Sequence, residues 1–92
     1  EFALNYPYPN PFNPVVNITF SLPNSAMILI EIFDLSGKLV KTVTKKIFKP
    51  GKYSLNWDAK DNLGTSVSSG VYLLKFEGEN NYKKTHKIIY LK

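Results

Sequence analysis

The sequence predicts an all-β fold, an antiparallel immunoglobulin-like β-sandwich of about seven strands, from three observations. Short apolar runs of strand length alternate with turn-forming clusters of Gly, Pro, Asn and Asp along the whole chain. No window of about ten residues shows the 3.6-residue periodicity of an amphipathic helix. The 92 residues suit one domain, and six Phe, six Tyr and one Trp can fill the dense core that so short a chain needs.

The predicted strands alternate with a period of two. The first runs from about Val15 to Leu22, and the second, which is the most apolar, runs from Met27 to Phe33. The third, about Lys38 to Thr44, is polar enough to lie at a sheet edge. Later strands are expected near residues 53–57, 71–77 and 82–91, and the last two form a hairpin. The side chains predicted to point inward are Ile18, Phe20, Leu22, Ile28, Ile30, Ile32, Tyr53, Leu55 and Trp57.

Several residues are expected to shape turns and strand starts. Asp34 and Gly37 mark a tight turn, in which glycine can take a positive φ at little cost. Gly51 precedes the strand that carries Tyr53 and Trp57, and Gly64 is expected to turn the long polar stretch at 58–69. The residues given a structural role are therefore Asp34, Gly37, Gly51, Tyr53 and Trp57.

The chain divides into a proline-rich segment or linker at residues 1–14 and a sandwich domain at residues 15–92. Four prolines lie within residues 5–14, and proline favours extended backbone on both sides of itself. Tyr6, Tyr8 and Phe12 are available to hold this segment against the sandwich. Glu1-Phe2 differ in character from the residues that follow and are compatible with a remnant of cloning.

Composition excludes several kinds of site. Cysteine is absent, which removes disulfides, thiolate nucleophiles and zinc-thiolate centres. The net charge is +5, but all twelve basic residues are lysine, which lacks the planar fork that usually recognises guanine or phosphate. No apolar stretch approaches the roughly 18 residues of a membrane-spanning helix, and no N-terminal signal peptide is recognisable.

No catalytic residue, metal ligand or cofactor is predicted. The single histidine, His86, is interpreted as a surface residue of the last strand. Asp58, Asp61 and Asn62 could bind calcium or form a turn. Their spacing does not match a calcium loop, so the turn is favoured. Trp57 lies in phase with Tyr53, which favours the core over a sugar-stacking surface.

Read in order, the motifs resemble the C-terminal sorting domain of the type IX (Por) secretion system of Bacteroidetes-type bacteria. They are also similar to the immunoglobulin-like domain of flagellar hook-capping proteins. The similarity extends from about Asn5 to Lys92, and one departure from it is Asp58-Ala59, where the family has aspartate and glycine. The motifs lie at Tyr8–Pro14, Asp34–Gly37, Gly51–Asp58, Ser69–Tyr72 and Lys84–Lys92.

The resemblance implies a non-catalytic tail that directs a larger secreted protein through the periplasm, across the outer membrane and to the cell surface. The implied partners are the outer-membrane secretion machinery, a sortase-like peptidase and a covalently linked N-terminal cargo domain; removal and retention of the tail both stay open. We expect the last strand to be recognised by strand addition at an exposed sheet edge. The residues expected to carry recognition are Pro9, Asn10, Pro11, Gly70, Tyr72, Lys87, Leu91 and Lys92.

Two other functions stay open on the sequence. One is an immunoglobulin-like accessory or spacer module of an extracellular enzyme or structural protein. The other is a carbohydrate-binding module. The sequence identifies neither the cargo nor the oligomeric state.

Overall fold

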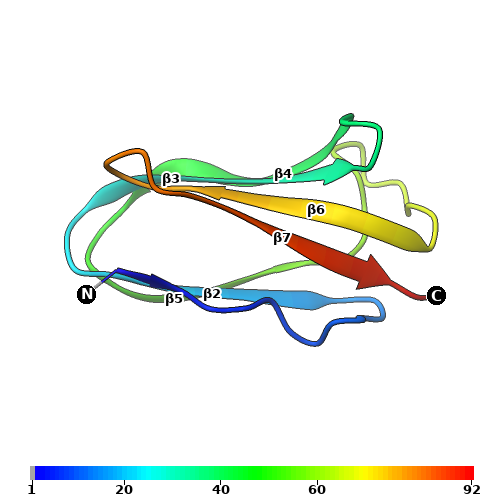
Figure 1. The fold of residues 1–92 in the computed structure, drawn as a ribbon, viewed down its shortest axis with the longest axis horizontal. Coiled ribbons are helices and arrows are strands. Elements are labelled where there is room, and N and C mark those ends of the chain that lie inside the picture. The colour runs from blue at the N-terminus through cyan, green and yellow to red at the C-terminus, as the bar shows by residue number, and fades with distance from the viewer. Residues whose placement is uncertain (1) are drawn as a thin grey trace.

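The computed structural model describes residues 2–92 and confirms the antiparallel β-sandwich (Figure 1). One sheet has three strands in the order β1-β2-β5, and the other has four in the order β4-β3-β6-β7. The strands are β1 Ala3–Leu4, β2 Val16–Leu22, β3 Ala26–Asp34, β4 Leu39–Phe48, β5 Gly51–Trp57, β6 Gly70–Glu77 and β7 Lys83–Tyr90. Residues 2–92 contain no helix, as expected, and hence none that could span a membrane.

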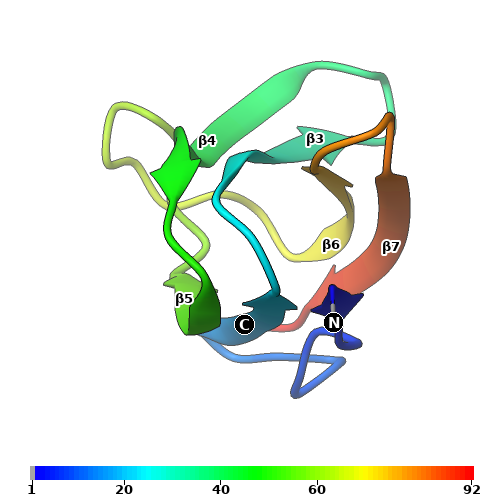
Figure 2. The ribbon, with the colours of Figure 1, turned by 90° about the vertical axis from the view of Figure 1, so that its left-hand side faces the viewer.

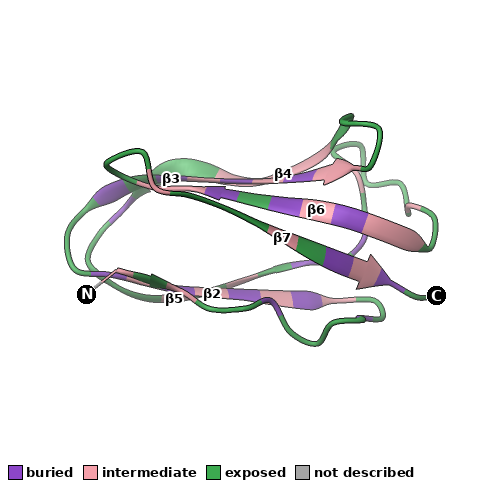
Figure 3. Ribbon diagram, viewed as in Figure 1, coloured by how far each residue is buried: buried purple, intermediate pink, exposed green. Residues whose placement is uncertain are grey.

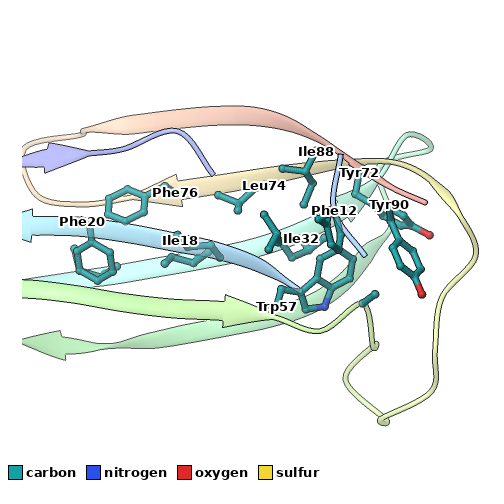
Figure 4. Packing of buried hydrophobic residues seen from close by; sticks show 14 of the residues in the cluster. Phe12, Ile18, Phe20, Ile32, Trp57, Tyr72, Leu74, Phe76, Ile88 and Tyr90 are labelled. Carbon is teal, nitrogen blue, oxygen red and sulfur yellow. The ribbon is translucent and has the colours of Figure 1, made fainter. Parts of the chain in front are cut away.

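The core lies between the sheets and follows the predicted alternation. Along β2 and β3 every second side chain is buried, from Val16 to Leu22 and from Ala26 to Ile32. Figure 4 shows Phe20, Ile18 and Trp57 meeting side chains of the opposite sheet. The predicted inward positions of Tyr53 and Leu55 pack against this core but are only partly buried. Among residues 2–92 no polar or charged residue is classed as buried, so the core is packed mainly through apolar contact.

The third predicted strand is at a sheet edge, as expected, but it is longer than predicted. Strand β4 continues to Phe48, whose ring lies 5.4 Å from Phe20 and 4.8 Å from Tyr53. Its pairing with β3 shifts register twice, between Ile30 and Glu31 and between Ile32 and Phe33. The missed residues pair in regular register with β3, but Lys45, Lys46 and Ile47 are all exposed, so no alternation in the sequence indicated that the strand continues.

The predicted hairpin of β6 and β7 is confirmed, with Gly70 opposite Tyr90 and Glu77 opposite Lys83. The sandwich is 37 Å long, and the two termini lie at opposite ends of it (Figure 1). Viewed along that axis, β1 lies next to β7, so the N-terminal segment borders the edge of the four-stranded sheet (Figure 2). This arrangement brings the proline-rich segment to the C-terminal strand.

The positive φ angles of Gly37 and Gly64 lead to a stability prediction. A Cβ added at either glycine meets no atom within 4 Å, but φ is +90° and +84°, which disfavours any other residue. Gly37→Ala and Gly64→Ala should each lower the free energy of unfolding by about 1–2 kcal/mol in urea titration. Gly78→Ala is the matched control, because its added Cβ makes only ordinary contacts and its φ is not positive. Equal losses at all three positions would contradict the conformational explanation.

Candidate functional site

The residues expected to carry recognition lie together at the C-terminal end of the sandwich. Asn10 bridges to β7: its Nδ2 donates a hydrogen bond to the Lys87 carbonyl at 2.9 Å, and its Oδ1 accepts one from the Ile89 amide at 2.9 Å. The flanking residues Pro9 and Pro11 are exposed. One amide side chain therefore satisfies a donor and an acceptor on the outer edge of β7.

Phe12 completes the contact between the proline-rich segment and β7. Its amide donates to the Ile89 carbonyl at 2.8 Å, and its carbonyl accepts from the Leu91 amide at 3.1 Å. Its ring is only 2% exposed, stacks on Tyr90 at 5.2 Å and lies 5.7 Å from Trp57 (Figure 4). We call residues 10–12 together with their contacts to β7 the N-terminal clamp.

The clamp changes the expectation of an exposed edge. Strand β7 is the last strand of its sheet, but four outward backbone groups near its end are already bonded to Asn10 and Phe12. They are the Lys87 carbonyl, the amide and carbonyl of Ile89, and the Leu91 amide. Backbone groups of an antiparallel strand point to alternate sides, so those of Lys83 and Thr85 point outward, like those of Lys87 and Ile89. Among residues 2–92 no hydrogen bond is recorded from that side to either residue. The exposed edge predicted for the last strand is thus restricted to its first half.

The remaining recognition residues hold the end of β7 from the other side. Gly70 pairs with Tyr90, and the Lys92 amide donates to Ser69 Oγ at 2.9 Å. The Tyr72 hydroxyl donates to the Ser68 carbonyl at 2.7 Å. Burial raises the pKa of Tyr72, and the negative charges of Asp34 and Tyr90 add to this effect. The hydroxyl therefore stays protonated as a donor. Leu91, at 51% exposed, and Lys92 project into solvent.

The expected structural residues of the turns are placed as follows. One carboxylate oxygen of Asp34 accepts hydrogen bonds from the Ser36 amide, the Ser36 hydroxyl and the Lys38 amide. These bonds, that of the Ser36 hydroxyl first, hold the pKa of Asp34 below its usual value. Gly37 follows with φ of +90°.

The residues given a structural role around β5 are also tied to the backbone. Gly51 has a φ of +149°, and the hydroxyl of Tyr53 donates to the Lys49 carbonyl at 2.6 Å. The Trp57 indole donates to the Lys60 carbonyl at 2.8 Å. Because Trp57 is 1% exposed, it offers no ring face for stacking on a sugar.

The loop after Trp57 is built as a turn. Asp61 Oδ1 accepts from the amides of Leu63 and Thr65, as a residue that organises its own turn does. No group of three or more His, Cys, Asp or Glu residues in the described chain is placed to hold a metal ion. Ala59 has φ of +61°, so alanine takes here the left-handed conformation that the family's glycine would favour.

His86 differs from the prediction of a plain surface residue. It is half-buried on the inward side of β7, its Nε2 is buried without a hydrogen-bond partner, and the Tyr6 ring lies edge-on at 5.2 Å. Burial lowers the pKa of His86, and the charge of Lys84 lowers it further. His86 lies two residues before Ile88 and four before Tyr90, and this period-two spacing could have indicated from the sequence that His86 faces the core. Tyr6 and Tyr8 themselves are 81% and 52% exposed, so of the three expected anchors only Phe12 enters the core.

A family model for the secretion system C-terminal sorting domain matches residues 7–91. Two solved proteins of Porphyromonas gingivalis share the fold. Latent dimeric PorU is 18% identical with a TM-score of 0.73, and the match covers 98% of this chain and 9% of PorU. PorZ, an essential bacterial surface component of the type-IX secretion system, is 24% identical with a TM-score of 0.67, and the match covers 98% of this chain and 12% of PorZ. The chain thus spans about a tenth of the length of either protein, and no curated protein sequence matches it.

The clamp predicts a local loss of stability on removal of the Asn10 amide. Asn10→Ala should lower the free energy of unfolding by about 1–2 kcal/mol, because two exposed hydrogen bonds are lost. Hydrogen exchange of the Ile89 amide should accelerate, since its acceptor is Asn10 Oδ1. The control is Asn24→Ala, an exposed loop asparagine at the other end of the sandwich. Unchanged exchange at Ile89 would show that the clamp does not hold β7 in solution.

The lowered pKa of His86 predicts a pH dependence of stability. The folded chain binds the imidazole proton less readily than the unfolded chain, so stability is complete above the ordinary histidine pKa of about 6.5. It should fall as pH decreases below that value, in urea titrations at about pH 7.5 and about pH 5. His86→Gln should reduce the difference between the free energies of unfolding measured at the two pH values. The Asp34 carboxyl, whose pKa is lowered from 3.8, changes the stability only below about that pH, which is outside the range compared here. An identical difference in the variant would assign the dependence to other groups.

Proposed function

The chain belongs to the family of secretion system C-terminal sorting domains, and on that premise we propose that the sorting signal is the closed C-terminal end of the sandwich. The family role places the protein on the route through the periplasm to secretion or the cell surface. The proposed signal comprises the exposed Pro9, Asn10 and Pro11, the β7 residues that they clamp, and the end of the chain. Its members are Pro9, Asn10, Pro11, Gly70, Tyr72, Lys87, Leu91 and Lys92.

The observation that carries this proposal is the pair of Asn10 hydrogen bonds to Lys87 and Ile89. The partners are 77 and 79 positions apart in the sequence, so they meet only in the folded domain. A receptor that reads both motifs at once therefore distinguishes a completed sandwich from an unfolded tail. Strand addition is left to the first half of β7, where no hydrogen bond from within residues 2–92 reaches the outward backbone groups.

The proposed partners follow from the two ends of the molecule. The family role implies contact with secretion machinery, and we assign that contact to an outer-membrane component at the C-terminal end. We assign a covalently linked cargo domain to the N-terminal side of β1, which lies at the opposite end of the 37 Å sandwich (Figure 1). A sortase-like peptidase cutting before β1 would release the cargo without disturbing the clamp.

The proposed role is non-catalytic. Sorting-tail domains in general carry no chemistry of their own. Two hollows in the described part of the chain each have a volume of about 300 Å³. One is mostly apolar around Phe2 and Tyr82. The other contains Asp34 and Asp61, whose carboxylates are each engaged by their own turn. The family match favours sorting over a spacer or a carbohydrate-binding module.

The test is export of a fluorescent reporter fused before residue 3 in a host that has a type IX system. The wild-type fusion should reach the cell surface. Deleting only Leu91 and Lys92 should reduce surface delivery about tenfold, a loss of about 1.4 kcal/mol in recognition, while leaving Ile88 and Tyr90 in the core. The control is the fusion with Asn24→Ala. Retention of the wild-type fusion in the periplasm would refute the sorting role, and normal delivery of the truncated fusion would remove the chain end from the signal.

A further inference from the structure

The two sheets present different side chains to solvent. On the three-stranded sheet every outward position of β2 and β5 is polar. These residues are Asn17, Thr19, Ser21, Lys52, Ser54 and Asn56. Buried and polar positions alternate in this way when one face of an antiparallel sheet packs on a core and the other meets water. This sheet is therefore an internal reference for a solvated face of the same protein.

The outer face of the four-stranded sheet is instead partly apolar, near the end of the sandwich where the chain terminates. Register places Leu39, Phe33, Leu73 and Lys87 in one row across the four strands, and Val71 beside Ile89 in the next. The five apolar members of these rows point away from the core and do not belong to its cluster. We call them the outer apolar patch: Leu39, Phe33, Val71, Leu73 and Ile89. Four of them are half-buried by their neighbours, and Leu39 is 40% exposed (Figure 3).

The outer apolar patch is bordered by lysines. Lys87 ends its first row, and the Lys75 ammonium lies 4.7 Å from the centre of the Phe33 ring. Neither row contains a carboxylate, and the next row holds Glu31 directly opposite Lys75. Two copies that met through this patch would bring lysine against lysine, which opposes self-association. The complementary surface is apolar and carries carboxylates.

We infer that the outer apolar patch is a docking face for a protein of the secretion machinery with an apolar, acidic surface. The inference rests on the proposed sorting function. It adds the outer apolar patch as a second surface that the receptor contacts, besides the C-terminal end of the sandwich. Half-buried side chains that lie level with a sheet suit the flat core of a protein interface, in which a few apolar anchors supply most of the affinity.

The position of Lys87 joins this face to the clamp. Its carbonyl is held by Asn10, while its side chain ends the row of Leu39, Phe33 and Leu73. A receptor that covers the patch therefore also reaches residues 10–12. The chain end, the clamp and the patch form one continuous surface at the C-terminal end of the sandwich.

The test uses the reporter fusion and two matched triple variants. Val71→Thr, Leu73→Thr and Ile89→Thr together keep strand-compatible side chains but remove the apolar face, and should lower surface delivery about tenfold or more. Asn17→Thr, Ser21→Thr and Ser54→Thr, on the reference face, should leave delivery within about twofold. Lys75→Glu should reduce delivery and Lys52→Glu should not. Circular dichroism and urea titration establish that each variant is folded.

A photo-crosslinking residue at position 73 identifies, in the same cells, the molecule that docks on the outer apolar patch. The expected product is an adduct with a second, different protein, which Lys75→Glu diminishes. Adducts confined to another copy of this chain or to lipid would overturn the inference, as would full delivery of the folded Val71, Leu73 and Ile89 triple variant. If the wild-type fusion itself is not delivered, the sorting function fails as well, so the two failures are distinguishable.

Discussion

The structure depends on how the open side of the sandwich next to β7 is closed. A terminal strand leaves a row of backbone donors and acceptors without partners, and a gap beside it would admit water to the core. Here Phe12 fills the gap with a buried ring against Tyr90 and Trp57, while its backbone bonds to Ile89 and Leu91. Asn10 extends the same closure to Lys87. Apolar burial and edge pairing are thus supplied by one short segment.

The composition of that segment fits this task. Prolines on both sides of Asn10 limit the backbone to extended conformations, so less entropy is lost when the segment lies along β7. They also lack the amide hydrogens that a further partner strand would require. The segment can therefore cap an edge without offering a new one. The same residues are those by which the chain resembles its family, so structural closure and recognition coincide in the sequence.

Much of this fold was predictable because β2 alternates strictly and the other apolar runs are bounded by turn-forming residues. The extension of β4 to Phe48 was not, because Lys45, Lys46 and Ile47 are all exposed and show no alternation. The resemblance indicated which motifs matter, but not that Asn10 meets Lys87, since no local pattern encodes a contact between residues so far apart. The outer apolar patch was hidden for another reason. The run from Met27 to Phe33 is apolar on both faces, and a continuous apolar run indicates a core strand without showing which side lacks a partner.

The two edges of the four-stranded sheet are protected in different ways, and this difference explains where recognition can be specific. Strand β4 carries Lys41, Lys45 and Lys46 together with its register shifts, which repel any incoming strand without selecting one. Strand β7 is protected by residues of defined shape that bond to defined atoms. Charge alone can be matched by many surfaces, whereas a proline-flanked amide, a chain end and an adjoining apolar face bordered by lysines form a combination that few proteins share. Selective export by a common machinery requires such a combination, and in this sandwich it occurs at the end where the N-terminal clamp and the last strand meet.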